Sequence, residues 1–387
     1  MTESQATNPV AEVVDTELAA TIPGADERVA MASQWQLMWW RLLEHRLAVG
    51  AGVILILFYL VAAFPGFFAY SNPRDTDAFR QHIPPQRIHL FDEGRFRPHV
   101  LGLRSERDPV TWMRVFEPDP EQKVPLRLFA RGYEYKLVGL IPTDIHLIGV
   151  TEGRAEDSIF LFGTDGMGRD LFSRTVHATQ ISLSIGLVGV LLSLFLGVLL
   201  GGISGYYGGV VDNIVQRLIE VLRSVPHIPL WMGLAAALPR DWSVIQLYFG
   251  ITVVLSLIGW TTLAREVRGR FLSLRDEDFV IAADLAGANQ MRIIFRHMVP
   301  AFLSHIIATT TLALPNMIIS ETSLSFLGLG MMPPAISWGV LLKDSQNVVA
   351  IAQTPWMLIP AIPVVVSILA FNFVGDGLRD AADPYAN

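Results

Sequence analysis

Long apolar segments are the feature that most restricts how this chain can fold. A helix needs roughly 20 mostly apolar residues to cross the hydrocarbon core of a bilayer. Six stretches meet this requirement: 47–68, 181–202, 211–238, 245–263, 302–319 and 356–374. Only 17% of the 387 residues are charged, against about 25% in a soluble domain. The sequence therefore predicts an all-α polytopic membrane protein with six transmembrane helices.

The third of these segments is the least regular. Its first part carries four charged side chains: Asp212, Arg217, Glu220 and Arg223. Charges are costly in hydrocarbon, so we expect this part to lie at the cytoplasmic interface or against protein. Pro226 and Pro229 follow and should kink the helix.

Arginines indicate the orientation in the membrane. Four of them follow the fourth segment in what is predicted to be a short loop: Arg265, Arg268, Arg270 and Arg275. Short cytoplasmic loops are enriched in positive charge, so this loop should be cytoplasmic. Tryptophans and arginines before residue 47 place the N-terminus on the same side. Residues 1–46 are predicted to form a cytoplasmic tail, with no signal peptide.

Between the first two spans lies a polar insert, residues 69–158, which is expected to be extracytoplasmic. Its stretch "KVPLRLFARGYEYKLVGL" alternates apolar and polar residues on both sides of Arg131-Gly132. Such alternation around a glycine predicts a β-hairpin over residues 124–138. The insert could add docking surface for a partner or cap the spans, and the sequence leaves both roles open. Residues 159–387 are then expected to form a core of five helices.

The chain lacks the motifs that common enzymes carry. It has no cysteine, no phosphate-binding loop with lysine, no H-E-x-x-H and no EF-hand loop. A net charge of −7 argues against nucleic-acid binding. His82, His89 and His99 could form a metal cluster, but they are better explained as ordinary surface residues. We therefore expect no catalytic residues, no metal and no cofactor in this chain, and no enzymatic activity of its own.

The most informative loop is residues 276–300, "DEDFVIAADLAGANQMRIIFRHMVP". Alanine and leucine favour helix, and Gly287 interrupts it. Residues 291–298 again have helical spacing, and Pro300 ends that helix or begins the next. The sequence thus predicts helix, glycine bend, helix. Two interpretations stay open from the residues alone. One is an amphipathic helix that covers the bundle, and the other is a small-residue helix that lies in a partner's groove.

Five motifs in order resemble the C-type permeases of the dipeptide/oligopeptide (peptide/nickel/opine) ABC importer family. The loop just described resembles their EAA loop. The other four are "FGTDGMGRDLFSR" (162–174), "GYYGGVVDNIVQRLIEVLRSVP" (205–226), "SETSLSFLGLGMMPPAISWG" (320–339) and "NFVGDGLRDAADP" (372–384). The resemblance covers about residues 158–386. It departs at Ile281, where the family has glutamate, and at Asp284, where a basic or polar residue is usual.

This resemblance implies a type I ABC importer permease fold and a bacterial inner-membrane location, with both termini cytoplasmic. The implied partners are a second, B-type permease subunit, two ATPase subunits that bind ATP and magnesium, an extracytoplasmic substrate-binding protein and membrane lipid. The implied ATPase-coupling residues are Ala282, Ala283, Asp284, Leu285, Ala286, Gly287, Ala288, Arg292, Arg296 and Pro300. The implied extracytoplasmic gate or docking residues are Gly163, Asp165, Gly168, Arg169, Asp170, Pro333, Pro334 and Trp338.

The transported solute stays open at this point. The resemblance favours peptides, and it also admits oligosaccharides, opines or nickel complexes. A secondary transporter that works alone is the competing function, but the sequence shows no pair of inverted halves. A membrane enzyme is the third possibility, and no catalytic constellation supports it.

Overall fold

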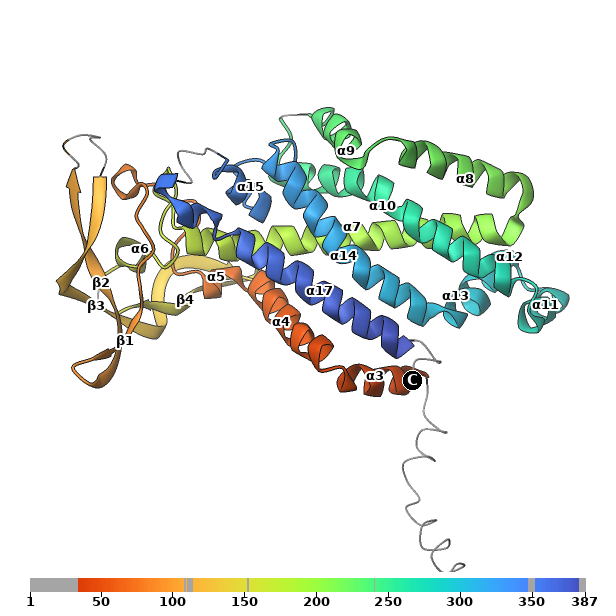
Figure 1. Ribbon diagram of the computed structural model, residues 1–387, viewed down its shortest axis with the longest axis horizontal. Helices are drawn as coiled ribbons and strands as arrows, with labels where there is room; N and C mark the ends of the chain where they lie inside the picture. Colours follow the sequence, from red (N-terminus) through yellow and green to blue (C-terminus); the bar gives the residue numbers. More distant parts are fainter. Residues whose placement is uncertain are drawn as a thin grey trace, which may run out of the picture.

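The computed structural model describes residues 34–382, except 108, 110–113, 152, 240 and 347–351. The expected cytoplasmic tail therefore lies outside the described residues up to residue 33. The described end of the predicted tail forms the helix α3 (Gln34–Glu44). The chain forms a long bundle of helices with a β-sheet at one end, and a short helical segment, α11, lies at the opposite end (Figure 1).

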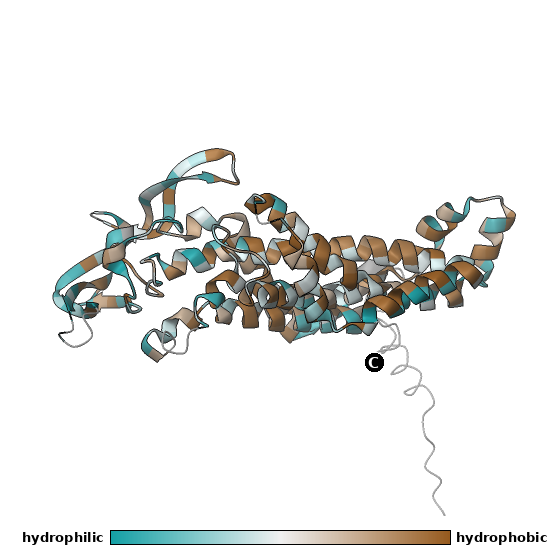
Figure 2. Cartoon of the chain, turned by 90° about the horizontal axis from the view of Figure 1, so that it is seen from above, coloured by the Kyte–Doolittle hydropathy of each residue, from teal (hydrophilic) through white to brown (hydrophobic). Residues whose placement is uncertain are grey.

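Five helical segments are long and apolar enough to cross a membrane among the described residues. They are α4 (Arg46–Ala63), α7 (Leu171–Tyr207), α10 (Val244–Leu274), α14 (Leu303–Phe326) and a segment that joins η3 (Pro355–Leu358) to α17 (Ala361–Ala382). They run roughly along one axis (Figure 1). The middle of the bundle is mostly hydrophobic, and hydrophilic residues gather toward both ends (Figure 2). This distribution is the one that a bilayer requires.

The third predicted span is two helices rather than one kinked helix. They are α8 (Gly209–Ser224) and α9 (His227–Ala236), and Val225 between them is extended. Pro226 has no N–H to donate, and a residue before proline is pushed out of the helical region. The helix therefore ends instead of bending. Figure 1 shows α8 and α9 one after the other beside α7 and α10.

α7 and α10 extend far beyond the apolar segments that predicted them. α7 begins ten residues before residue 181, at Leu171, where Asp170 caps it by accepting from the N–H of Ser173. α10 continues through Arg265, Arg268 and Arg270 to Leu274. The prediction of a short arginine-rich loop there is wrong. Arginine is a good helix former, so the helix extends beyond the apolar part of its sequence.

The insert contains a four-stranded antiparallel meander in the order β1-β2-β3-β4. Its strands are β1 (His89–Asp92), β2 (Arg95–Arg107), β3 (Arg114–Leu137) and β4 (Ile141–Val150). The predicted hairpin turn at Arg131-Gly132 is wrong, because β3 runs through it with only a shift of register toward Tyr135. The turn lies at Val138 and Gly139, which have positive φ.

Shorter helices connect these elements. They are α5 (Pro65–Phe68), η1 (Ala78–Arg80), α6 (Ala155–Ser158), α11 (Asp278–Leu285), α12 (Gln290–Arg292), the π-helical turn η2 (Ile293–Met298), α13 (Val299–Ala301) and α15 (Trp338–Lys343). α5 follows α4 directly and contacts β3 and β4. The sheet is thereby attached to the end of the first span.

Glycines allow close packing between α7 and α10. A Cβ atom on Gly201 would lie 2.4 Å from the carbonyl oxygen of Ala264, and one on Gly205 would lie 2.8 Å from that of Arg268. Both distances are shorter than atoms can tolerate. Small residues allow such close approach of helices in membranes.

Candidate functional site

The chain between α10 and α14 forms a compact helical segment at the end of the bundle farthest from the sheet (Figure 1). It consists of α11, a glycine turn, α12, η2 and α13. The predicted order of helix, glycine bend and helix is confirmed. Pro300 lies inside α13, and the entry to α14 follows at Phe302.

A set of backbone hydrogen bonds ends α11 at Gly287. The N–H of Gly287 donates to the carbonyl of Asp284 (2.8 Å), and the N–H of Ala288 donates to that of Ala283 (3.1 Å). Gly287 itself has φ +76°. This is the Schellman arrangement, which needs a left-handed residue and therefore favours glycine. The turn satisfies the last carbonyls of α11 without help from a partner.

One face of α11 packs against the bundle. Val280 is buried, and Ala283 and Ala288 pack on a cluster that includes Phe271 of α10 and Ile294 of η2. Small alanine side chains let α11 lie close to this cluster. α11 thereby shares one hydrophobic cluster with α10 and with η2, which leads toward α14.

The opposite face of α11 is apolar and exposed. We call it the docking face, and it comprises Phe279, Ile281, Ala282, Leu285 and Ala286. Leu285 is 84% exposed, far beyond what a leucine needs for packing within this chain. Exposed apolar patches on otherwise polar ends mark protein or lipid contacts.

Polar groups surround the docking face. Asp284, Arg292 and Arg296 are exposed. Ile281, which stands where related loops have glutamate, belongs to the docking face and not to the core. The docking face is therefore more apolar with Ile281 than it would be with glutamate at this position. Every coupling residue expected from the sequence except Pro300 falls on α11, its glycine turn, α12 or η2, and Pro300 falls on α13.

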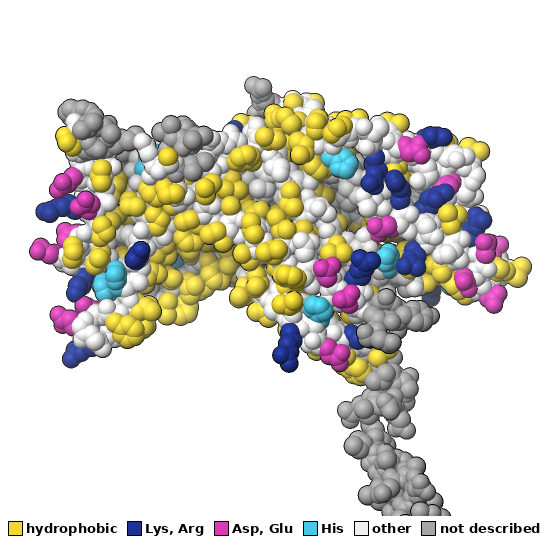
Figure 3. Space-filling model, viewed as in Figure 1, with side chains coloured by type: hydrophobic (Ala, Val, Ile, Leu, Met, Phe, Trp, Pro, Cys, Tyr) yellow, Lys and Arg dark blue, Asp and Glu magenta, His cyan; other side chains and the backbone are white. Residues whose placement is uncertain are grey.

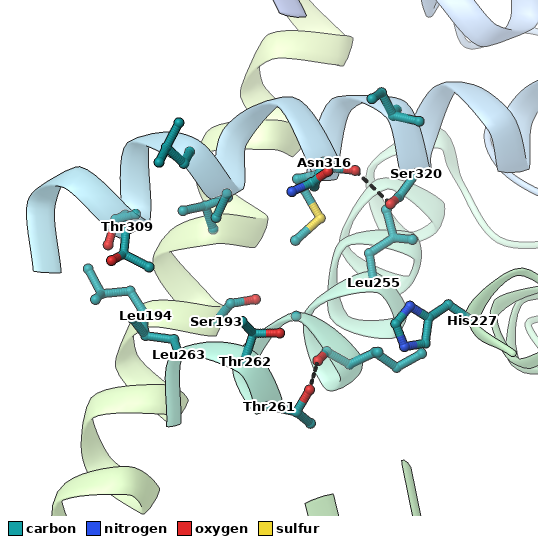
Figure 4. A pocket seen from close by; sticks show the side chains of 18 of the residues that line it. Ser193, Leu194, His227, Leu255, Thr261, Thr262, Leu263, Thr309, Asn316 and Ser320 are labelled. Carbon is teal, nitrogen blue, oxygen red and sulfur yellow. Dashed lines mark hydrogen bonds between the residues drawn. The ribbon is translucent and has the colours of Figure 1, made fainter. Parts of the chain in front are cut away.

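A second candidate feature is a cavity of about 1100 Å³ inside the bundle. Its walls come from α7, α9, α10 and α14, and Figure 4 shows several of the side chains that line them. The polar residues are mostly neutral: Ser193, Thr261, Thr262, Thr309, Thr310, Asn316 and Ser320. The cavity wall also carries four ionisable residues: His227, Glu266, His305 and Arg379. A cavity of this volume is large enough for a small solute.

Several polar atoms on this wall have no hydrogen-bond partner among the described residues. They are the Thr310 hydroxyl, the Trp231 indole N–H and one carboxylate oxygen of Glu266. That oxygen lies 3.9 Å from Nε2 of His305. Buried polar groups normally have partners, so these atoms are available to water or a solute.

The sequence interpretation did not identify these lining residues. One signal was present, since Thr309, Asn316 and Ser320 recur at intervals of seven and four residues. This spacing puts them on one face of a helix. A polar stripe within an otherwise apolar span is typical of a helix that lines a path or packs on another helix.

The segment 163–170, expected to be a gate or docking element, is largely internal. Asp165 is buried and receives Nε of Arg169 at 2.7 Å and the side chain of Arg174. Asp170 is also buried and receives the hydroxyl of Tyr70 at 2.8 Å. Burial raises the pKa of the Asp170 carboxyl to about 6. These contacts fix the start of α7 to the residues that follow α5.

Two glycines complete this junction. Gly163 and Gly168 both have φ +74°. A Cβ atom would lie 2.4 Å from the carbonyl oxygen of Ile83 at Gly163, and 1.9 Å from that of Asp77 at Gly168. Of the other expected docking residues, Trp338 is fully buried while Pro333 and Pro334 are exposed. Among the expected gate or docking residues, Pro333 and Pro334 are therefore the exposed ones in this conformation.

Gly168→Ala is expected to destabilise the junction by about 3 kcal/mol, because it combines an unfavourable positive φ with a backbone clash. Gly94→Ala is the matched control, since Gly94 has φ +79° and open space around it. That variant should lose only about 1 kcal/mol. Thermal unfolding of the two purified proteins in the same detergent gives the comparison. Equal losses would mean that the contact with Asp77 contributes nothing.

His89 and His99, considered above as metal ligands, stack on each other with ring centroids 5.4 Å apart. His82 belongs instead to the segment beside Gly166. Among the described residues, no group of three His, Asp or Glu side chains is placed to hold a metal ion.

Comparison with known proteins identifies the family. Residues 197–386 match the family described as binding-protein-dependent transport system inner membrane component. Residues 33–85 match the N-terminal TM domain of oligopeptide transport permease C. A putative peptide permease protein of Brucella suis is 38% identical over 247 residues, which cover 63% of this chain and 79% of that protein. The chain belongs to the inner membrane components of binding-protein-dependent transport systems.

Other relatives carry a more specific name. The oligopeptide transport system permease protein OppC of Bacillus subtilis is 37% identical over 258 residues, 66% of this chain and 79% of that protein. OppC of Escherichia coli is 42% identical over 224 residues, 58% of this chain and 72% of that protein. A solved structure of the inward facing MetNI methionine ABC transporter covers 54% of this chain and 96% of its own, with a TM-score of 0.43 and 16% identity. The family assignment rests on the sequence relatives.

The matched ranges divide the permease into parts that match the family models and a part between them that does not. The range 197–386 contains α11, the docking face and most of the cavity wall. The four strands of the sheet lie between the two matched ranges. The loop at 276–300 therefore lies within a range that matches the family, whereas the sheet lies outside both matched ranges.

Proposed function

We propose that this permease is the C-type subunit of an ABC importer that carries peptides across a bacterial inner membrane. The observation that carries the proposal is the docking face of α11. It is apolar and exposed on one side, and it is packed onto α10 and η2 on the other. A partner that moves this face would move the helices around the cavity. The substrate class follows from the relatives named as peptide and oligopeptide permeases.

In the proposed topology, α8 and α9 together form the third span in chain order. They bring the five long helical segments to the six spans of a type I importer fold. Both termini and α11 lie in the cytoplasm, and the sheet lies outside. The arginines at the end of α10 support this orientation, since positive charge concentrates on the cytoplasmic side. One of them, Arg268, pairs through two nitrogens with Asp212 of α8. Of the charges at the start of the third predicted span, Asp212 therefore faces protein, whereas Arg217, Glu220 and Arg223 are exposed.

The proposed assembly contains a B-type permease, two ATPase subunits and an extracytoplasmic binding protein. ATP and magnesium bind to the ATPase subunits, and this chain holds no cofactor. ATP hydrolysis in those subunits then moves the docking face of α11, and this movement drives transport. The chain has no catalytic role of its own in this scheme.

The cavity would form this chain's part of the translocation path. Its neutral hydroxyl and amide groups can exchange hydrogen bonds with peptide groups of many sequences, because they carry no charge that selects one side chain. The unpartnered atoms of Thr310 and Trp231 would contribute in the same way. Hydroxyl-rich oligosaccharides could use the same groups and are the alternative substrate class.

Asn316→Trp should test the path. A bulky ring on the cavity wall is expected to lower peptide uptake at least about tenfold, a change of roughly 1.4 kcal/mol in the rate-limiting barrier. Leu369→Trp on α17 is the control, since Leu369 is 49% exposed and does not line the cavity. Uptake is measured in proteoliposomes that hold the complete importer, with labelled peptide and oligosaccharide in parallel. Normal peptide uptake by Asn316→Trp would contradict the proposed path, and uptake of oligosaccharide alone would replace the substrate class.

A further inference from the structure

The turn between β3 and β4 presents an apolar tip that nothing in this chain covers. Leu140 is 80% exposed, Val138 64% and Ile141 62%. We call Leu137, Val138, Gly139, Leu140 and Ile141 the hairpin tip. Turns at the surface of a protein in water are normally polar, with Asn, Asp or Gly at the bend. An apolar surface of this kind marks a contact with another apolar phase.

The backbone of the tip points to the same need. Val138 has φ +51°, a conformation that a β-branched residue rarely adopts. Asparagine or glycine would fit this position with less strain. Strained residues of this kind persist where their side chain has a function. The tip therefore keeps a valine side chain at a cost to the turn.

The polar groups of the tip are largely satisfied within the hairpin. The N–H of Gly139 donates to the carbonyl of Lys136 (3.1 Å), and the N–H of Leu140 donates to that of Leu137 (3.0 Å). A segment that enters lipid must satisfy its backbone donors internally, since hydrocarbon offers no partner. This turn meets the requirement at its outermost residues.

The base of the hairpin is fixed beside the end of the first span. Nδ1 of His146 lies 2.7 Å from the carbonyl oxygen of Gly66 and 2.6 Å from that of Ala69. The rings of Phe129 and Phe67 lie 6.2 Å apart. Both contacts join the hairpin to α5, which directly follows α4. The strands that carry the tip are thus held at the level where α4 ends (Figure 1).

The neighbouring surface is one that lipid must cover. Only 17% of the apolar window of α4 is buried within this chain. Two exposed apolar residues of β3 add to this apolar surface: Leu128 (63% exposed) and Phe129 (62% exposed). Hydrophobic side chains extend without a break between the bundle and the sheet on the face shown in Figure 3. The sheet thus presents apolar surface next to the span's own lipid-facing side.

We infer that the hairpin tip inserts into the membrane surface beside the end of α4 and anchors the sheet to the lipid. Tyr133 and Tyr135 then lie near headgroup level, where tyrosine is enriched, and Lys136 can extend its charge toward the headgroups. The inference requires only that α4 spans the membrane. Under the proposed function, which it extends, the lipid is the outer leaflet.

The absence of cysteine from the sequence allows a direct test. Leu140→Cys, labelled with an environment-sensitive fluorophore, is reconstituted as the full chain in lipid nanodiscs. Glu121→Cys, an exposed position elsewhere on β3, is the matched control. Emission from position 140 should shift to the blue and be quenched by lipids with a nitroxide near the headgroup. Its quenching by aqueous iodide should be about fivefold weaker than at position 121, because ions do not enter hydrocarbon.

A second variant separates lipid contact from damage to the fold. Val138→Asn, placed in the Leu140→Cys protein, suits the backbone at φ +51° and should leave thermal unfolding unchanged or improved. It should nevertheless reduce quenching by the lipid nitroxide. Iodide quenching at position 140 equal to that at position 121 would overturn the anchor. So would protection that appears only when the substrate-binding protein is added. Peptide uptake is measured separately, so a failure of the proposed substrate leaves the fluorescence result intact.

Discussion

Leu285→Asp is expected to abolish transport while the permease still folds. Leu285 is 84% exposed on the docking face and has little to lose within its own chain. In the assembled importer the aspartate would have to enter an apolar contact without a partner for its charge. Such burial costs about 3 kcal/mol or more, so association with the ATPase subunits should weaken roughly a hundredfold.

The measurement is co-purification of the ATPase subunits with the permease, together with ATP hydrolysis stimulated by the loaded binding protein. Ser273→Asp is the matched control, because it adds the same charge to an exposed position at the end of α10. It should retain both properties. Normal assembly and stimulated hydrolysis in Leu285→Asp would show that the docking face does not contact the ATPase. Position 283 is less suitable for this test, because Ala283 packs on the cluster around Phe271.

The helix, glycine turn and helix of residues 276–300 could be predicted because their causes are local. Gly287 ends α11 through hydrogen bonds to residues three and five positions earlier, and such capping depends on neighbours in sequence. The docking face was less accessible to prediction. α11 carries apolar residues on several sides, including Phe279, Val280 and Ile281. Only the position of Phe271 and Ile294 decides that Val280 is buried and Ile281 exposed.

The sheet shows where local signals fail. Arg131-Gly132 has the composition of a turn, yet β3 continues through it, because β4 pairs on both sides of the position. The side chain of His146 lies over Gly132, where a Cβ atom would be 2.6 Å from its ring. The glycine is therefore needed for packing and not for a bend. This requirement comes from a residue on another strand, which alternation of residue types cannot reveal.

The burial of Asp165 and Asp170 in the segment 163–170 could not be predicted, for a similar reason. The segment's glycines and aspartates have the composition of an exposed loop, and the family resemblance suggested a docking role. The structure buries Asp165 and Asp170 beneath residues 70–83. That cover lies some ninety residues earlier in the chain, so the sequence around the motif gives no sign of it. Contact with the binding protein is a proposal. Pro333 and Pro334 are exposed and could form that contact.

Gly201→Val should lower the free energy of unfolding by about 3 kcal/mol or more. The new Cβ would lie 2.4 Å from the carbonyl oxygen and 2.9 Å from the Cα of Ala264. Both are backbone atoms of α10, so no side chain can rotate away, and the helices must separate. Gly50→Val on α4 is the matched control, since nothing lies within 4 Å of a Cβ there. Thermal unfolding in nanodiscs compares the two.

Equal losses in the two variants would assign the effect to the helix propensity of valine and not to packing. A loss confined to Gly201→Val would identify the contact of α7 with α10 as the structural link of the permease. α10 lines the cavity with Thr261 and Leu263 and packs on α11 through Phe271. A wider separation from α7 would therefore alter the path and the coupling segment together. For this reason Gly201→Ala, even where it folds, should couple ATP hydrolysis to uptake less efficiently than Gly50→Ala.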